Sequence, residues 1–228
     1  MNCFIDIETI PTQPEAETKA EIAKTIEAPA TMKKAETIAD WHNGAGKYAG
    51  VKDAAIEEAY RKTALDGSKG EIISVCCASD NTAPYASYRN VKHSESDLIG
   101  EIFEDICNAC AGKGHNSEPY FIGHNVQWDL KFIWHRAVIL GVKPPFKLPF
   151  GGRHKSDYYD NMQAWAGFGQ RISQDNLAKA LGIAGKPDDI DGSKVWDFVK
   201  AGNVKRVAEY NKYDVETVIE IYNRINFS

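Results

Sequence analysis

The chain of 228 residues is long enough to bury one large core, so its length predicts a single domain. Hydrophobic residues make up 43% of the sequence and charged residues 26%, which is typical of globular proteins. No apolar run approaches the ~20 residues that a membrane span needs, so a membrane protein is not expected. The net charge of −5 argues against binding of duplex nucleic acid through a broad positive surface, although divalent cations in an acidic site could supply positive charge locally.

The cysteines and the first residues predict a cytoplasmic protein. Five cysteines, an odd number with Cys76 and Cys77 adjacent, do not suggest a disulfide framework in a chain of this length. The first residues also lack the basic segment and apolar run of a secretion signal, because Asp6 and Glu8 interrupt the only hydrophobic stretch there. A reducing compartment therefore fits best.

In chain order, the hydrophobic pattern predicts strands that alternate with helices. Strands are indicated by alternation and β-branched residues, and helices by apolar residues three and four positions apart, such as Leu98, Ile102 and Ile106. The predicted strands cover residues 3–7, 70–79, 84–90 and 119–125, and the predicted helices cover residues 94–110, 127–141, 160–165, 173–183, 192–202 and 203–225. Such a succession predicts an α/β domain with a mixed sheet.

Residues 12–70 lie between the first two predicted strands and far exceed the usual connection of ~4 to 6 residues. This segment is rich in Ala, Glu and Lys, and its apolar spacing predicts two or three short helices. We interpret it as a helical insertion in a single domain that covers residues 1–228. It would serve either as surface decoration or as a lid or clamp beside an active site.

Four acidic residues are candidates for one site. Asp6 and Glu8 are two residues apart in a strand, so their side chains project to the same face. Asp129 begins a helix after a buried strand, where α/β sheets gather ligands. Tyr210 and Asp214 share the inward face of the last helix, and an aspartate there is costly unless a charge, such as a metal ion, satisfies it. Each acid alone also has an ordinary explanation, such as exposure on an edge strand or stabilisation of a helix N-terminus.

Taken together, the motifs Asp6-x-Glu8, Asn125-x-x-x-Asp129 and Tyr210-x-x-x-Asp214 resemble the three exonuclease motifs of the tyrosine-containing (DEDDy) branch of the DEDD superfamily. The segments DNMQAWAG, ISQDNLAKALGIAGKPDDIDGSKVWDFVKAG and VAEYNKYDVETVIEIYNRI look like stand-alone predicted exonucleases related to the proofreading domain of family B DNA polymerases. The resemblance covers the first strand and most of residues 70–225. It implies a DnaQ-like, ribonuclease-H-like α/β fold with a five-stranded mixed sheet flanked by helices, and 3′-to-5′ exonuclease chemistry.

The resemblance also implies a two-metal-ion mechanism. Its metal ligands would be Asp6, Glu8, Asp129 and Asp214, and Tyr210 would orient the attacking water. Oxygen-only ligands suit two divalent cations, Mg²⁺ or Mn²⁺, better than zinc.

Substrate contacts follow from the same resemblance. Thr9 would bond to the 3′ end, Ile10 would wedge against a base, and Asn125 would bond to the terminal sugar or the adjacent backbone. The favoured substrate is the 3′ end of single-stranded DNA, and the alternatives are an exoribonuclease or a non-catalytic nucleic-acid-binding or replisome module. No polymerase domain is recognised in the sequence, so proofreading would require a separate polymerase or replisome component as partner, and no membrane partner is expected.

Overall fold

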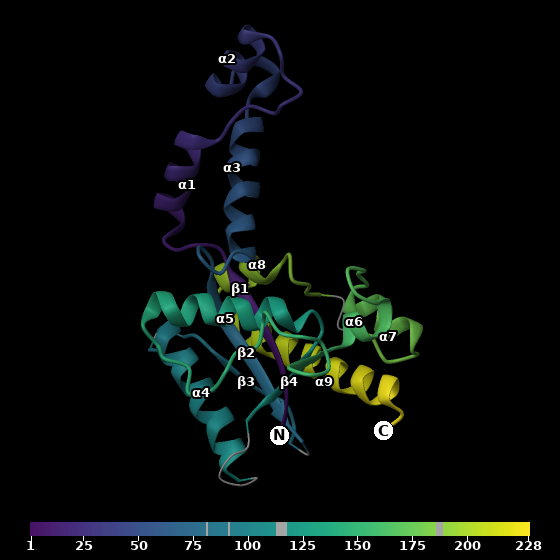
Figure 1. Ribbon diagram of the computed structural model, residues 1–228. Coiled ribbons are helices and arrows are strands. Elements are labelled where there is room, and N and C mark those ends of the chain that lie inside the picture. Colours follow the sequence, from purple (N-terminus) through teal and green to yellow (C-terminus); the bar gives the residue numbers. More distant parts are fainter. Residues whose placement is uncertain (81, 91, 113–117, 186–188) are drawn as a thin grey trace. The chain divides into compact units, whose positions relative to one another are not determined.

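The computed structural model describes residues 1–80, 82–90, 92–112, 118–185 and 189–228 (Figure 1). Within these ranges the chain divides into two compact units. The first, here called the sheet unit, consists of Met1–Thr9 and Ile72–Ser228. The second, here called the inserted unit, is Ile10–Glu71.

The described residues form a five-stranded sheet with the strand order β3-β2-β1-β4-β5. Strand β1 is parallel to β4, β4 is parallel to β5, and β2 is antiparallel to β3, so the sheet is mixed as the sequence predicts. The strands are β1 (Asn2–Ile10), β2 (Glu71–Ser79), β3 (Tyr85–Tyr88), β4 (Tyr120–Gly123) and β5 (Tyr158–Asp160).

Helices pack on both faces of this sheet, with α9 in yellow in Figure 1. On one face, Cys3, Ile5 and Ile7 of β1 share a core with the apolar stripes of α4 and α5. On the other face, Phe4 shares a core with Val215 and Val218 of α9. The helices of the sheet unit are α4 (Glu95–Ala111), α5 (Val126–Leu140), α6 (Asn161–Ala166), α7 (Gln174–Ala180), α8 (Val195–Lys200) and α9 (Val204–Asn226).

A buried ion pair ties α4, α5 and β2 together. Glu95, at the start of α4, accepts hydrogen bonds from Arg136 of α5 through both carboxylate oxygens, at 2.9 and 2.7 Å. The same carboxylate accepts a 2.7 Å bond from the backbone N–H of Ile72. Glu95 and Arg136 are only 5% and 7% exposed, so each charge depends on the other for compensation.

The inserted unit is helical, which confirms the helices predicted there. Ile10–Glu71, all of which the structure describes, contains three α-helices and two short 3₁₀ turns, one between the second and third helices and one after the third. Lys19 of α1 forms ion pairs with Glu15 and with Glu57 of α3, and Trp41 and Tyr60 are fully buried. The elements are α1 (Glu15–Thr25), α2 (Ala35–Asn43), η1 (Gly46–Tyr48), α3 (Val51–Lys62) and η2 (Thr63–Leu65).

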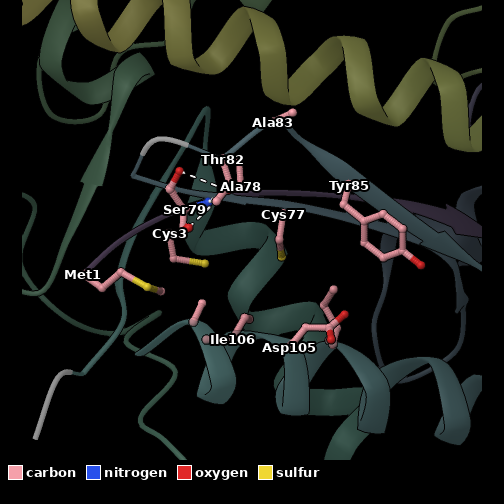
Figure 2. A pocket seen from close by; sticks show the side chains of 12 residues that line it. Met1, Cys3, Cys77, Ala78, Ser79, Thr82, Ala83, Tyr85, Asp105 and Ile106 are labelled. Carbon is pink, nitrogen blue, oxygen red and sulfur yellow. Dashed lines mark hydrogen bonds between the residues drawn. The ribbon is translucent and has the colours of Figure 1, made fainter. Parts of the chain in front are cut away.

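A cavity of about 380 Å³ lies between β2 and α4 (Figure 2). Its walls include Cys3 and Cys77 from the sheet and Ile102, Asp105 and Ile106 from α4. The side chain of Cys3 is on the face of the sheet that α4 and α5 cover. This cavity therefore lies on the opposite face from the even-numbered side chains of β1. No helix among the described residues has the length and apolar character of a membrane span.

Candidate metal centre

The pleat of β1 places Asp6 and Glu8 on the face of the sheet that α9 covers. The odd residues of the strand lie in the core under α4 and α5, while Phe4 contacts the α9 side. Two-residue alternation therefore directs Asp6 and Glu8 toward α9 as well. Glu8 is buried and Asp6 is partly exposed. Asp6 lies at the middle of β1 and Glu8 nearer its carboxyl end, the end at which ligands gather in α/β sheets.

Helix α9 brings the third carboxylate to this place. Ligand oxygens of Asp6, Glu8 and Asp214 all lie within 4.8 Å of one another. Tyr210 is one helical turn before Asp214, on the same face, and its hydroxyl is close enough to the Asp214, Glu8 and Asp6 carboxylates for their charges to raise its pKa. The structure thus assembles residues from the first strand and the last helix, more than two hundred positions apart in the chain.

Asp129 lies beside this cluster without belonging to the group of three. It is in the first turn of α5, is 5% exposed, and its carboxylate accepts a hydrogen bond from the backbone N–H of Ile7. Burial, and next the negative charge of Asp6, raises the pKa of Asp129 well above its usual range. The side chain therefore reaches β1 close to Asp6, in surroundings that disfavour an additional negative charge.

Two amide side chains hold the cluster. Asn211 of α9 donates a 2.7 Å hydrogen bond from Nδ2 to Oδ2 of Asp6. Gln174, the first residue of α7, donates from Nε2 to Oδ1 of Asp214 at 3.0 Å. Neither residue was expected from the sequence. A signal existed for Asn211, because it is three residues before Asp214 on a helix whose inward face was identified, but the sequence contains no comparable signal for Gln174.

The proposed substrate contacts differ in accessibility. Thr9 and Asn125 are partly exposed, whereas Ile10 is 3% exposed. Asn125 has a backbone conformation in the left-handed region (φ 64°), which Asn tolerates better than most residues, and its N–H donates to Oδ1 of Asp160 at 2.9 Å. Asp160 also caps α6 by accepting from the N–H of Met162. The backbone geometry alone therefore gives a reason for an asparagine at position 125.

The ionisation of Tyr210 is governed by its burial and its acidic neighbours. Burial, followed by the charges of Asp214, Glu8 and Asp6, raises the pKa of the Tyr210 hydroxyl above its usual value. The side chain is 5% exposed. The phenol consequently keeps its proton at neutral pH and can act as a hydrogen-bond donor.

The donor set fits hard divalent cations. Among the described residues, no other group of three or more carboxylate, imidazole or thiol side chains comes so close together. The possible metal ligands of the Asp6, Glu8 and Asp214 cluster are all carboxylate oxygens, which Mg²⁺ and Mn²⁺ prefer. Zinc is more often bound by nitrogen and sulfur. Like charges this close are unfavourable without positive charge between them, so the cluster is suited to a cation.

The fold places the chain in the ribonuclease-H-like class. The structure is similar to that of the family B DNA polymerase from the hyperthermophilic archaeon Pyrobaculum calidifontis, with a TM-score of 0.57 and 11% sequence identity. The match covers 99% of this chain and 24% of the polymerase chain, so the chain spans about a quarter of the polymerase's length. At this identity the similarity concerns the fold, and it confirms the ribonuclease-H-like α/β architecture predicted from the sequence.

The family is given by a separate comparison. A family model described as a predicted 3′-5′ exonuclease related to the exonuclease domain of PolB matches residues 68–228. The chain belongs to this family, which confirms the resemblance to predicted exonucleases related to the proofreading domain of family B DNA polymerases. A comparison with curated proteins found no match.

Proposed function

We propose that the chain is a metal-dependent 3′-to-5′ exonuclease of the DEDDy type that releases nucleotides from the 3′ end of single-stranded DNA. The observation that carries this proposal is the meeting of the Asp6, Glu8 and Asp214 carboxylates beside Tyr210, in a member of a predicted 3′-5′ exonuclease family. In this proposal residues 1–228 act as one exonuclease domain into which residues 12–70 are inserted.

Asp6, Glu8, Asp129 and Asp214 would hold two divalent cations, Mg²⁺ or Mn²⁺. The proximity of the first, second and fourth carboxylates supports this ligand set, and so does the bond between Asp129 and the backbone of Ile7 next to Asp6. Bound there, the cations would supply charge balance, activation of a water nucleophile and stabilisation of charge at the reacting phosphate. The protein's part is to fix the carboxylates in place, and the bound cations would favour their ionised forms.

Tyr210 would orient the attacking water. Its raised pKa means that Oη retains the proton, so the hydroxyl is suited to donating a hydrogen bond and unsuited to removing a proton from water. The effect of the Asp214, Glu8 and Asp6 charges on the pKa of Tyr210 supports a position of Oη beside the proposed ligands, where a nucleophilic water would have to lie. Substitution should therefore affect turnover more than binding.

Thr9, Ile10 and Asn125 are the proposed substrate contacts. Thr9 and Asn125 are partly exposed, which supports a role for their side chains in contacting a 3′-terminal nucleotide. Ile10 is 3% exposed, so a contact between its side chain and a base requires neighbouring side chains to move. If the enzyme proofreads newly made DNA, a separate polymerase or replisome component would be its partner.

Digestion of end-labelled single-stranded DNA, matched RNA and primer-template duplex tests the proposal. We expect stepwise release of mononucleotides from the 3′ end with Mg²⁺ or Mn²⁺, abolished by EDTA. Asp6→Asn and Asp214→Asn should lower the rate by more than about 10²-fold, the loss typical of one well-placed group that stabilises transition-state charge. Asp105→Asn is the matched control, because this exposed acid of α4 lines the cavity on the other face of the sheet.

The outcomes separate the alternatives. Faster digestion of RNA than of DNA would change the substrate to RNA. If the protein binds DNA but leaves the substrate intact under every condition, that result would contradict the proposed exonuclease activity. It would favour a non-catalytic nucleic-acid-binding module.

A further inference from the structure

We propose that Asn211 is a positioning residue for Asp6 and that Ser74 fixes its orientation, so that a buried hydrogen-bond chain sets the cation affinity of the carboxylate cluster. This inference rests on the proposed function and deepens it. It assigns a role to two residues that do not belong to the proposed ligand set.

The first link of the chain joins α9 to β1. Asn211 is fully buried, and its Nδ2 lies 2.7 Å from Oδ2 of Asp6. A donor at this distance restrains the rotation of the Asp6 carboxylate, so its oxygens are held in one orientation before a cation binds. Helix α9 therefore contributes Asp214 directly to the cluster and also restrains Asp6 on another element.

The second link determines which end of the amide faces Asp6. Oγ of Ser74, on β2, lies 3.0 Å from Oδ1 of Asn211 and 3.1 Å from the backbone carbonyl oxygen of Ser87 on β3. Ser74 is the donor in both contacts and its single hydroxyl hydrogen is shared between the two acceptors, so Oδ1 of Asn211 faces a donor. An amide with its oxygen toward Ser74 necessarily has its NH₂ group toward Asp6.

Burial makes this orientation costly to change. Ser74 and Asn211 are both 0% exposed. Turning the amide over would direct its oxygen at the carboxylate of Asp6, so that two buried acceptors would face each other. Three strands and one helix thus fix a single donor toward Asp6, before any cation or nucleic acid binds.

The position of Asn211 on α9 links this hydrogen-bond chain to the proposed catalytic residues. Asn211 is adjacent to Tyr210 and three residues before Asp214, so all three side chains lie on neighbouring parts of one helix. A shift of α9 would move the water-orienting hydroxyl, one ligand and the support of a second ligand together. Removal of a side chain that hydrogen bonds to a metal ligand typically lowers metal affinity or activity by ~10 to 100-fold.

The test measures Mn²⁺ binding without nucleic acid, by isothermal titration and by the electron paramagnetic resonance signal of free Mn²⁺. Asn211→Leu keeps a similar volume and removes both hydrogen bonds, and it should weaken Mn²⁺ binding by ~10 to 100-fold. Ser74→Ala leaves the amide in place without its orienting donor, and it should weaken binding by only ~2 to 10-fold, as expected for one neutral hydrogen bond.

Two further comparisons separate positioning from a general loss of structure. Asn161→Leu removes another fully buried amide, which donates 2.9 Å to the Val218 carbonyl of α9, and should leave Mn²⁺ affinity unchanged. In the Asn211→Leu background, Ser74→Ala should cause no further loss of affinity, because Ser74 acts through Asn211. At saturating Mn²⁺, the kcat for single-stranded DNA should return to near the wild-type value in both single variants.

Each outcome bears on one of the two proposals. Absence of Mn²⁺ binding by the wild-type protein would overturn the proposed cation site. Tight wild-type binding that Asp6→Asn abolishes, together with unchanged affinity in Asn211→Leu and Ser74→Ala, would overturn the positioning role alone. If Asn211→Leu does not fold, the affinity of the milder Ser74→Ala variant decides the question.

Discussion

At the scale of single residues, surroundings give ordinary side chains their proposed roles. Tyr210 is a phenol whose pKa is raised, first by burial and then by three nearby carboxylates. Asp129 is an acid whose pKa is raised, first by burial and then by Asp6. Both shifts would be reduced or reversed by cations bound among the carboxylates, since positive charge stabilises phenolate and carboxylate forms.

Tyr210→Phe isolates the hydroxyl. The substitution keeps the buried ring and removes Oη, so we expect kcat to fall by roughly 10²-fold, within the range for a lost proton-handling or water-orienting group, with little change in DNA affinity. Single-turnover rates and fluorescence anisotropy with labelled single-stranded DNA measure the two quantities. Tyr213→Phe, at an exposed position on the same helix, is the control and should behave as wild type. Equal losses of kcat and affinity in Tyr210→Phe would argue against a water-orienting role.

The proposed carboxylate ligands can be predicted from the sequence, but the amide side chains that hydrogen bond to them cannot. Strand alternation places Asp6 and Glu8 on one face of the first strand, and helix periodicity places Tyr210 and Asp214 on one face of the last helix. A shared site can therefore be inferred from periodicity. The bond from Asn211 to Asp6 joins residues 205 positions apart, and the bond from Gln174 to Asp214 joins residues 40 apart. Such partners depend on side-chain packing between elements, which periodicity does not reveal.

At the scale of elements, most predicted segments agree with the structure to within a few residues. The last helix, predicted at 203–225, spans Val204–Asn226, and the helix predicted at 94–110 spans Glu95–Ala111 behind a Ser94 capping box. Strand β5 (Tyr158–Asp160) was not predicted from local pattern, because three residues are too few to show alternation. Its formation depends on parallel pairing with β4, which is a tertiary interaction.

The Glu95–Arg136 pair should dominate the stability of the layer formed by α4 and α5. Glu95→Ala leaves the Arg136 charge and the Ile72 N–H buried without their acceptor, so we expect a loss of about 3 to 5 kcal/mol in the free energy of unfolding. Urea denaturation followed by circular dichroism measures it. Glu104→Ala, at an exposed position of α4, should change stability by less than about 0.5 kcal/mol. Similar values for both variants would contradict the importance of the buried pair.

At the scale of the whole molecule, the insertion separates one motif from the others. The family match covers residues 68–228, whereas Asp6 and Glu8 precede the inserted unit Ile10–Glu71. The two ends of this unit lie close together, because a Cβ atom added to Gly70 would be 3.0 Å from the carbonyl oxygen of Ile10. A short connection could therefore join the ends. Composition predicted the insertion and its helices, but it contains no information on what the insertion contacts.

Replacing residues 12–69 with a short Gly-Ser linker tests whether the sheet unit is an exonuclease domain in its own right. We expect a protein that unfolds cooperatively and binds Mn²⁺ as the full chain does, because the core clusters and the proposed ligands belong to Met1–Thr9 and Ile72–Ser228. Calorimetry and Mn²⁺ titration measure this. A lid or clamp role would appear as a loss of DNA affinity or processivity in the shortened protein. An unfolded product would show that the inserted unit is required for the fold.

The central claim is that side chains from β1, α5 and α9 meet around a pair of cations. A crystal structure with Mn²⁺, using anomalous scattering at the manganese edge, tests it most directly. We expect two anomalous peaks about 3.5 to 4 Å apart, ligated by Asp6, Glu8, Asp129 and Asp214. An absence of peaks at this cluster under saturating Mn²⁺, or a manganese site that excludes Asp214, would contradict it.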